Sequence, residues 1–415
     1  MREKTDQGNS NFRRWWVIGG LLFLITAINY LDRQTFPILI KEISKEIPID
    51  NLTFARLNSA FLFTYALMYA GGGWLVDRLG SRWGYALVAG FWSLSCMLHS
   101  LANSVFSLGA FRLMLGAGEG GGFPASAKVV SEWFTKKDRA MAMGLFNTGS
   151  AVGATLAPPL IAIIAGCWSW RAAFVLFGCI GLVWVALWLL LYRPAESAAP
   201  RAVKEKSTPW ITLLKKKQVW TLITVKFLTD GPWFFLIFWL PKYLNDARGF
   251  NLKEIGSVAW IPYACAGIGS LAGGWVSSRL VGKLGLDRAR KTSLLISGIF
   301  FPLAWAITSL PVAGAILVMC VLFLAHQFWS VNMQTLPADI FPSAQVGSVA
   351  GIIGCAGSLG AVCFGELVGH LLKASGGNYE WPFVMAGLLH PVSIVILMVF
   401  LKKIEPDSHQ SICLV

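Results

Sequence analysis

Long apolar runs, separated by short charged loops, constrain this chain more than any other feature. A helix needs about 20 apolar residues to cross a bilayer, and twelve such runs can be traced. They cover residues 15–40, 54–76, 83–101, 104–134, 140–166, 170–192, 219–243, 253–280, 292–310, 312–335, 346–373 and 381–401. A single spanning segment satisfies its own backbone hydrogen bonds only as an α-helix. The sequence therefore predicts an all-α polytopic membrane protein with twelve transmembrane helices.

The composition and charge agree with this class. Charged residues make up 13% of the 415 residues, against about 25% in soluble domains. The net charge of +14 sits in short loops, so we interpret it as a topological signal and expect no nucleic-acid partner. The eight cysteines form no Cys-x-x-Cys motif, and neither a disulfide framework nor a metal site is predicted.

A polar stretch divides the runs into two groups of six. Residues 193–217 are rich in Pro, Ala, Lys and Arg and are predicted to be a linker. The predicted domains are an N-terminal six-helix bundle (1–192), a cytoplasmic linker (193–217) and a C-terminal six-helix bundle (218–415). Most loop Lys and Arg lie on the linker's side, which predicts cytoplasmic N- and C-termini. We expect a multi-pass monomer in the plasma membrane, the inner membrane of a bacterium.

A short motif recurs at equivalent places in the two halves. Residues 72–80 read Gly-Gly-Trp-Leu-Val-Asp-Arg-Leu-Gly, and residues 273–280 read Gly-Gly-Trp-Val-Ser-Ser-Arg-Leu. The two segments end the second and the eighth predicted helix. Parallel repeats with a site at their interface are typical of transporters.

Two neighbouring charges, Asp32 and Arg33, lie inside the first apolar run. Each costs about 2.5–3.5 kcal/mol at membrane depth. Adjacent residues point about 100° apart on a helix, so each needs its own partner. A guanidinium suits bidentate contact with a carboxylate, which makes Arg33 the predicted substrate anchor. Burial and a nearby arginine act in opposite directions on protonation of Asp32, a balance that suits proton exchange. A structural ion pair between helices is the alternative for both.

Two further charges, Arg112 and Glu119, lie seven residues apart in the fourth run. Two turns separate them by roughly 10 Å along the axis, too far for a pair within one helix. We expect Arg112 to reach Asp32 or another helix and to tune the pKa of Asp32. Glycines on both sides of Glu119 allow a neighbouring helix to approach closely. We expect Glu119 to face the cavity, with a packing role as the alternative.

Several motifs carry a resemblance to a known family. Segment 73–82, Gly-x-Leu-Val-Asp-Arg-x-Gly-x-Arg, closely matches the loop motif between helices 2 and 3 of the major facilitator superfamily. Segment 112–118, Arg-x-x-x-Gly-x-Gly, matches that superfamily's helix 4 motif. Three further segments resemble the anion:cation symporter branch of that superfamily: 29–33, 116–124 and 133–134. Segments 326–332 and 338–342 look most like those of hexuronate and aldonate transporters.

The resemblance implies roles for the charged residues. It implies that Asp32 and Glu119 are protonation sites and that Arg33 holds the substrate carboxylate. It also implies that Asp77, with Arg78 and Arg82 beside it, meets the start of helix 11 near 347–348 and closes the cytoplasmic side. Such a carboxylate is favoured by the helix dipole by about 0.3–1 kcal/mol.

Polar and aromatic side chains are candidates for reading the sugar hydroxyls. They are Tyr30, Tyr65, Asn147, Ser150, Gln327, Trp329, Asn332 and Ser358. Galactonate-type members usually have glutamine at the position of Ser150, so the particular sugar acid stays open. Lys226 and Asp230, spaced i, i+4, favour a local ion pair over a cavity role. His326 is predicted to be a hydrogen-bonded structural histidine rather than a proton carrier.

Together these features predict a secondary active transporter, not an enzyme. It is expected to import a monocarboxylate sugar acid, such as glucuronate, galacturonate or galactonate, by proton symport with alternating access. No P-loop or metal cluster is recognisable, so no cofactor beyond the coupling protons is expected. Three alternatives remain: a symporter of another organic anion such as an aromatic or phthalate-like acid, an uncoupled organic-anion facilitator, and a membrane sensor that binds without flux.

Overall fold

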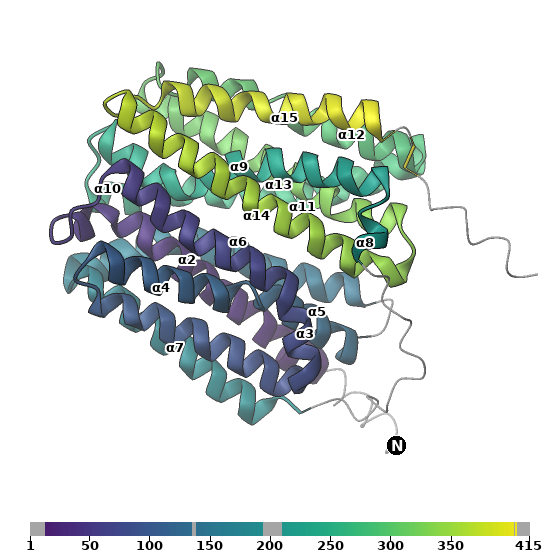
Figure 1. The fold of residues 1–415 in the computed structure, drawn as a ribbon, viewed down its shortest axis with the longest axis horizontal. Helices are drawn as coiled ribbons and strands as arrows, with labels where there is room; N and C mark the ends of the chain where they lie inside the picture. Colours follow the sequence, from purple (N-terminus) through teal and green to yellow (C-terminus); the bar gives the residue numbers. More distant parts are fainter. Residues whose placement is uncertain (1–12, 135–137, 194–209, 402, 405–415) are drawn as a thin grey trace, which may run out of the picture. The chain divides into compact units, whose positions relative to one another are not determined.

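The computed structural model describes residues 13–134, 138–193, 210–401 and 403–404, and in these ranges every regular element is a helix (Figure 1). The all-α expectation is confirmed. Most of the predicted linker and both chain ends, on which the predicted topology partly rests, lie outside the described residues. The N-terminal elements are η1 (Arg13–Gly19), α2 (Gly20–Ser44), α3 (Asn51–Leu98), η2 (His99–Leu101), α4 (Val105–Glu119), α5 (Gly122–Trp133), α6 (Arg139–Cys167) and α7 (Trp170–Leu191).

The C-terminal elements also lie along the predicted apolar runs. They are α8 (Trp210–Leu213), α9 (Lys217–Asp246), α10 (Leu252–Val258), α11 (Trp260–Leu284), α12 (Leu286–Gly298), η3 (Phe301–Ala306), α13 (Val312–Ile340), α14 (Ser343–Ala374) and α15 (Glu380–Phe400). The chain divides into two compact units. The first unit is Met1–Arg201 with Leu240–Trp260, and the second is Ala202–Trp239 with Ile261–Val415.

Nine helical spans among the described residues are long and apolar enough to cross a membrane. One of them, Asn51–Leu101, has 51 residues, enough for two crossings at about 20 residues each. The fourth and ninth predicted helices are interrupted and so are not among the nine. α4 gives way to α5 at Gly120–Gly121, and α12 gives way to η3. Nine spans are therefore consistent with the twelve predicted crossings.

The chain reverses direction within the element drawn as α3. Gly80 has φ 77° and ψ 159°, outside the helical region. A Cβ on Gly84 would lie 2.9 Å from the Cα of Val76, although eight residues of continuous helix would span about 12 Å. Gly285, before α12, has nearly the same backbone angles, φ 76° and ψ 167°. The sequence repeat is thus accompanied by the same glycine turn in each unit, a conformation that favours residues without a Cβ.

Segment 240–260 groups with the first unit because α10 packs on α6. A Cβ on Gly256 would lie 2.5 Å from the Cβ of Ala162 and 3.2 Å from the carbonyl oxygen of Pro158. Only a glycine permits so close an approach of the two helices. The domain boundary predicted from the sequence, at residue 218, does not assign segment 240–260 to the first unit. That boundary stays a prediction.

Candidate functional site

A buried ion pair joins α2 to α4. Arg33 Nε donates a hydrogen bond to Glu119 Oε2 at 2.9 Å, and Arg33 Nη2 lies 2.9 Å from the same oxygen. Nη2 also donates to Asn29 Oδ1 at 3.1 Å, one helical turn away. The arginine and glutamate side chains are 5% and 0% exposed. Because a lone charge at this depth is costly, each side chain compensates the other.

Aromatic rings surround the guanidinium of Arg33. Its Cζ lies 4.8 Å from the ring centroid of Tyr30, 4.9 Å from that of Tyr65 and 5.7 Å from that of Phe61. Rings within about 6 Å attract a cation through their electron-rich faces. Four predicted site residues, Arg33, Glu119, Tyr30 and Tyr65, therefore come together in the first unit.

Asp32 points toward a different neighbour. Its side chain is fully buried, and its Oδ1 accepts a weak hydrogen bond from Cys96 Sγ of α3 at 3.5 Å. Its Oδ2 is buried without a hydrogen-bond partner. The expectation that Asp32 and Arg33 have separate partners is confirmed. An ionised carboxylate held by one thiol is poorly compensated.

Glycines allow α4 to bring Glu119 to this point. A Cβ on Gly118 would lie 2.5 Å from Trp92 Cβ, and one on Gly120 would lie 2.5 Å from the carbonyl oxygen of Tyr65. One on Gly116 would overlap the carbonyl oxygen of Phe61. Both arms of α3 thus approach α4 at backbone distance, and the predicted close packing around Glu119 is confirmed.

Arg112 is fully buried and turned toward α3. Its Nη2 donates to Asn58 Oδ1 at 2.8 Å, and its Nε donates to the carbonyl oxygen of Leu57 at 3.3 Å. Its Cζ lies 4.5 Å from the ring of Phe61 and 4.8 Å from that of Phe36. The expected reach to another helix is found, with α3 as that helix. The tuning of Asp32 stays a prediction.

The two candidates on α6 lie beside α2. Gly149 and Gly153 of α6 face the backbone of Phe23 and Ala27, which brings the two helices into close contact. Asn147 is exposed and Ser150 is half-buried, with its Oγ donating to the Asn147 carbonyl oxygen at 2.6 Å. Their role as hydroxyl readers stays a prediction.

The candidates in the second unit lie mostly within its packing. Trp329 is 1% exposed and belongs to the hydrophobic core, and Asn332 is fully buried, donating to the Phe328 carbonyl oxygen at 2.9 Å. Ser358 is 4% exposed and donates to Gly354 of its own helix, and Gln327 is half-buried. A substrate role for these four stays a prediction.

Two interpretations from the second half agree with the geometry. Lys226 Nζ donates to Asp230 Oδ1 at 2.7 Å within α9, the local ion pair that the spacing favours. His326 is 1% exposed, stacks on Trp233 at 4.4 Å, and shares a hydrogen bond of 3.2 Å with His390. The structural interpretation of His326 is therefore supported. His390, on α15, was not predicted.

The motif at the Gly80 turn makes contacts inside the first unit. Lys128 Nζ of α5 donates to Asp77 Oδ1 at 2.8 Å, with the carboxylate 76% exposed. Arg82 Nη2 donates to the Leu189 carbonyl oxygen at 2.6 Å, and the Arg78 Cζ lies 5.5 Å from the Trp74 ring. The contact of Asp77 with helix 11 stays a prediction.

Sequence reasoning missed the second unit's ion pair at the equivalent turn. Arg290 Nε of α12 donates to Asp339 Oδ2 of α13 at 2.7 Å, and its Nη1 donates to Ser277 Oγ of α11 at 2.7 Å. It also missed Asn29, one turn from Arg33. A search for polar residues one turn from each buried charge would have found Asn29.

Comparisons with known proteins identify the family of the chain. The Major Facilitator Superfamily model matches residues 22–365. The hexuronate transporter of Escherichia coli (strain K12) is 29% identical over 384 residues, which cover 88% of each chain. The galacturonate transporter of Dickeya chrysanthemi is 32% identical over 281 residues, 63% of this chain and 81% of that protein.

A solved structure shows the same fold. It is a bacterial homolog of the human lysosomal transporter Spinster, in an inward-facing and occupied conformation. The TM-score is 0.77 at 18% identity, over 94% of this chain and 97% of that one. The resemblance to sugar-acid transporters is confirmed by the named relatives, and an enzymatic function is excluded by the family. The chain belongs to the major facilitator superfamily of membrane transport proteins.

Proposed function

We propose that this protein imports a monocarboxylate sugar acid, a hexuronate or an aldonate, by proton symport with alternating access. The single observation that carries the proposal is the buried pair of Arg33 and Glu119. The relatives named as hexuronate and galacturonate transporters support the substrate class. The proposed location is a bacterial inner membrane, with both termini cytoplasmic and the chain monomeric.

Glu119 occupies the position that a substrate carboxylate needs. Its Oε2 takes hydrogen bonds from the guanidinium fork, and its Oε1 is buried without a partner. When Glu119 binds a proton its charge is lost, and the Arg33 fork is free to take a carboxylate from the substrate. Because either Glu119 or the substrate neutralises Arg33, substrate binding and proton binding occur together.

Asp32 supplies a second proton site in this proposal. Its contact with the Cys96 thiol and its unpartnered Oδ2 compensate a negative charge poorly. A proton removes that cost. Asp32 is therefore suited to carry a proton while the substrate crosses the membrane. Arg112 interacts electrostatically with both Glu119 and Arg33 and so influences the exchange without a contact to substrate.

The cycle then needs only exchange at this cluster and a change of access. Protons and substrate enter together from outside, and the halves rock to open inward. Asp77, Arg78 and Arg82 close the cytoplasmic side during the outward-open phase. Release of the substrate is followed by release of the protons, after which Glu119 again pairs with Arg33.

The test is uptake of labelled glucuronate, galacturonate and galactonate into proteoliposomes with an imposed pH gradient. We expect accumulation of at least one of them, and its loss when the gradient is collapsed. Transport of none of the three would sink the sugar-acid assignment, and a phthalate in the same assay would then identify another anion. Accumulation that is unchanged without the gradient would show an uncoupled facilitator.

Two neutral variants test the proton assignment. Glu119→Gln and Asp32→Asn should lose accumulation but keep counterflow of the substrate. Glu42→Gln is the matched control, because Glu42 lies on the same helix as Asp32 and pairs with Lys45 near its end. If both neutral variants accumulate substrate as the control does, the proton sites lie elsewhere.

A further inference from the structure

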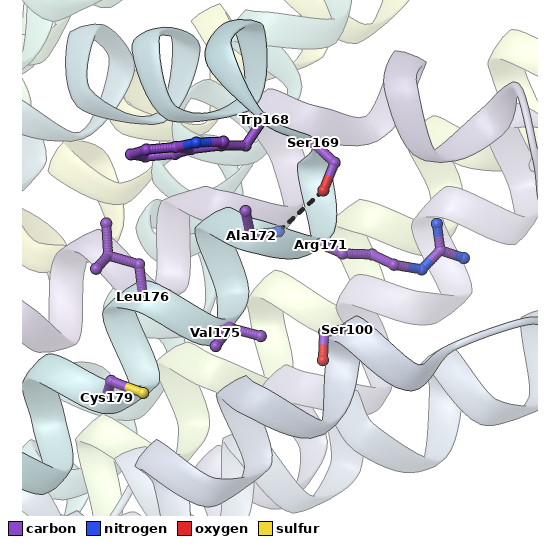
Figure 2. Close-up of a pocket in the computed structure, with 8 residues that line it drawn as sticks. All are labelled: Ser100, Trp168, Ser169, Arg171, Ala172, Val175, Leu176 and Cys179. Carbon is purple, nitrogen blue, oxygen red and sulfur yellow. Dashed lines mark hydrogen bonds between the residues drawn. The ribbon is translucent and has the colours of Figure 1, made fainter.

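An apolar groove opens on the first unit where α7 begins. Its volume is about 520 Å³. Figure 2 shows its lining, which is Ser100, Trp168, Ser169, Arg171, Ala172, Val175, Leu176 and Cys179. None of these residues belongs to the Arg33 cluster, and the proposed transport function makes no use of them.

The groove has a polar end and an apolar end. Ser100, Ser169 and Arg171 lie at the end where α7 starts, and Val175, Leu176 and Cys179 follow along the helix (Figure 2). Apolar exposure continues down α7, with Ile180 39% exposed, Val183 59% and Leu187 41%. The groove therefore forms the N-terminal part of a long apolar stripe along α7.

The polar end has the chemistry of a membrane–water interface. Trp168 is 72% exposed, and Arg171 Cζ lies 4.1 Å from the ring of Trp170. Arg171 pairs with Glu46, which follows α2. Tryptophan and charged residues are enriched where a bilayer meets water. The polar end thus lies at headgroup level, and the apolar end lies at acyl-chain level.

We propose that this groove binds a phospholipid of the surrounding bilayer, with an acyl chain along Val175, Leu176 and Cys179 and the phosphate at Arg171. A guanidinium is suited to phosphate because its planar donors form two parallel hydrogen bonds. The Ser169 Oγ accepts from the amide of Ala172 at 3.3 Å, which leaves its hydroxyl proton to donate.

Glu46 and the carbonyl oxygen of Ala102, which accepts from Arg171 Nη2 at 3.3 Å, compete with the phosphate. Arg171 Nη1 donates to Glu46 Oε2 at 2.5 Å, and Trp170 Nε1 donates to Glu46 Oε1 at 2.9 Å. The hydrogen bonds from Trp170 and Arg171 hold the pKa of the Glu46 carboxyl below its ordinary value, so it is ionised at neutral pH. A bound phosphate must share or take the guanidinium from this carboxylate. Occupation of the groove therefore acts on the link between α7 and the loop after α2.

The test uses the full protein in proteoliposomes with a phosphatidylglycerol that carries a diazirine on its acyl chain. After illumination, mass spectrometry maps the labelled peptides. We expect strong labelling of residues 168–179, reduced at least about five-fold by Leu176→Trp, which fills the groove. Val183→Trp is the matched control, since it adds the same ring to the exposed stripe outside the groove. Uniform labelling along α7 that Leu176→Trp leaves unchanged would overturn the proposal.

Two further variants test the phosphate contact. Arg171→Gln should lower the labelling, and Glu46→Gln should raise it, because the competing charge is gone. A diazirine diacylglycerol, which lacks the phosphate, should respond to neither variant. If the diacylglycerol labels the groove as strongly as phosphatidylglycerol does, the acyl-chain contact stands alone and the phosphate assignment is wrong.

Discussion

Both units bury an ion pair at membrane depth, but the two pairs are built differently. Arg33 and Glu119 lie 86 residues apart, on α2 and α4. Lys226 and Asp230 lie four residues apart within α9. In a pair that joins two helices, a ligand can replace the acid when the acid binds a proton. Loss of the pair then removes a contact from both helices. A pair within one turn is a local feature, which a helix can hold without its neighbours.

The same kind of close helix packing occurs in both units, with the glycines on opposite partners. In the first unit Gly116 of α4 and Gly120, which directly follows α4, meet the backbone of Phe61 and Tyr65 on α3. α4 is part of the fourth predicted helix, and this arm of α3 is the second.

In the second unit the glycines belong to the eighth predicted helix instead. A Cβ on Gly269 of α11 would lie 2.8 Å from the Cα of Leu324 of α13, and one on Gly273 would lie 2.8 Å from the Cα of Phe328. From the first close approach to the second, the contact moves four residues forward along both α11 and α13. The two helices therefore run in the same direction. Both units thus pack two helices at backbone contact, with the glycines on opposite helices of the pair.

One turn before these glycines the two units differ in charge. In the first unit Arg112 donates to the backbone of Leu57. In the second unit Cys320 of α13 interacts electrostatically with Cys265 of α11. The first unit places a buried cation at this register, and the second places two neutral thiols. The buried charge at this register therefore lies in the first unit.

The largest expected effect comes from exchanging the cations of the two ion pairs. Arg33→Lys should weaken sugar-acid binding about 30-fold or more, because a point charge cannot form two parallel hydrogen bonds to a carboxylate. Lys226→Arg, the matched change in the second unit, should alter binding by less than about three-fold. Equilibrium binding of labelled hexuronate to purified protein measures both. Equal losses in the two variants would contradict the contrast between the pairs.

A second effect is expected in stability. Gly116→Ala and Gly273→Ala should each destabilise the fold by about 1–3 kcal/mol, since the added Cβ meets backbone atoms that cannot move aside. Gly274→Ala is the control, because its Cβ would meet only Val331 Cγ1, at 3.9 Å. Apparent Tm values in detergent rank the variants. A Gly273→Ala protein as stable as Gly274→Ala would show that the helices are less closely packed.

A smaller effect is expected at the glycine turns. The side chains of Arg290 and Asp339 are 14% and 16% exposed, so Asp339→Asn should cost about 1–3 kcal/mol. Asp77 is 76% exposed, so Asp77→Asn should cost less than about 1 kcal/mol of stability. The same Tm assay distinguishes them. A larger loss for Asp77→Asn would mean that Asp77 has a stronger contact than the one to Lys128.

The smallest effect on stability is expected at the thiol pair. Cys265→Ser should change stability by less than about 0.5 kcal/mol, as the site is neutral and the volumes are similar. Oxidation of the unmodified protein with copper phenanthroline should cross-link Cys265 to Cys320, detected as a joined peptide in mass spectrometry. The serine variant serves as the control and should give no such peptide. Cross-linking of Cys320 to any other cysteine in preference would contradict the register of α11 and α13.

Much of the fold could be predicted from the sequence. The run at 312–335 became Val312–Ile340, and the run at 219–243 became Lys217–Asp246, because apolar length is a local property. The break at Gly120–Gly121 was not predicted. It arises where both arms of α3 press on α4, and that packing is not visible in the residues of α4 alone.

The candidate site divides in the same way. Asp32, Arg33 and Glu119 stand out in the sequence because each is a charge in an apolar run. That Arg33 pairs with Glu119, and Asp32 with Cys96, could not be predicted, since the partners come from helices distant in the sequence. His390 was missed for the same reason, because its partner His326 lies on another helix.

The sequence by itself determined that this chain is helical, that it crosses a bilayer many times, and that four charges, Asp32, Arg33, Arg112 and Glu119, lie within apolar runs. Those properties follow from the cost of moving each segment from water into hydrocarbon, which depends on that segment alone. Only the tertiary structure decided which charges neutralise one another. The pairing depends on close approaches at glycines that bring α4 against α3 and place Glu119, rather than Asp32, within hydrogen-bond reach of Arg33.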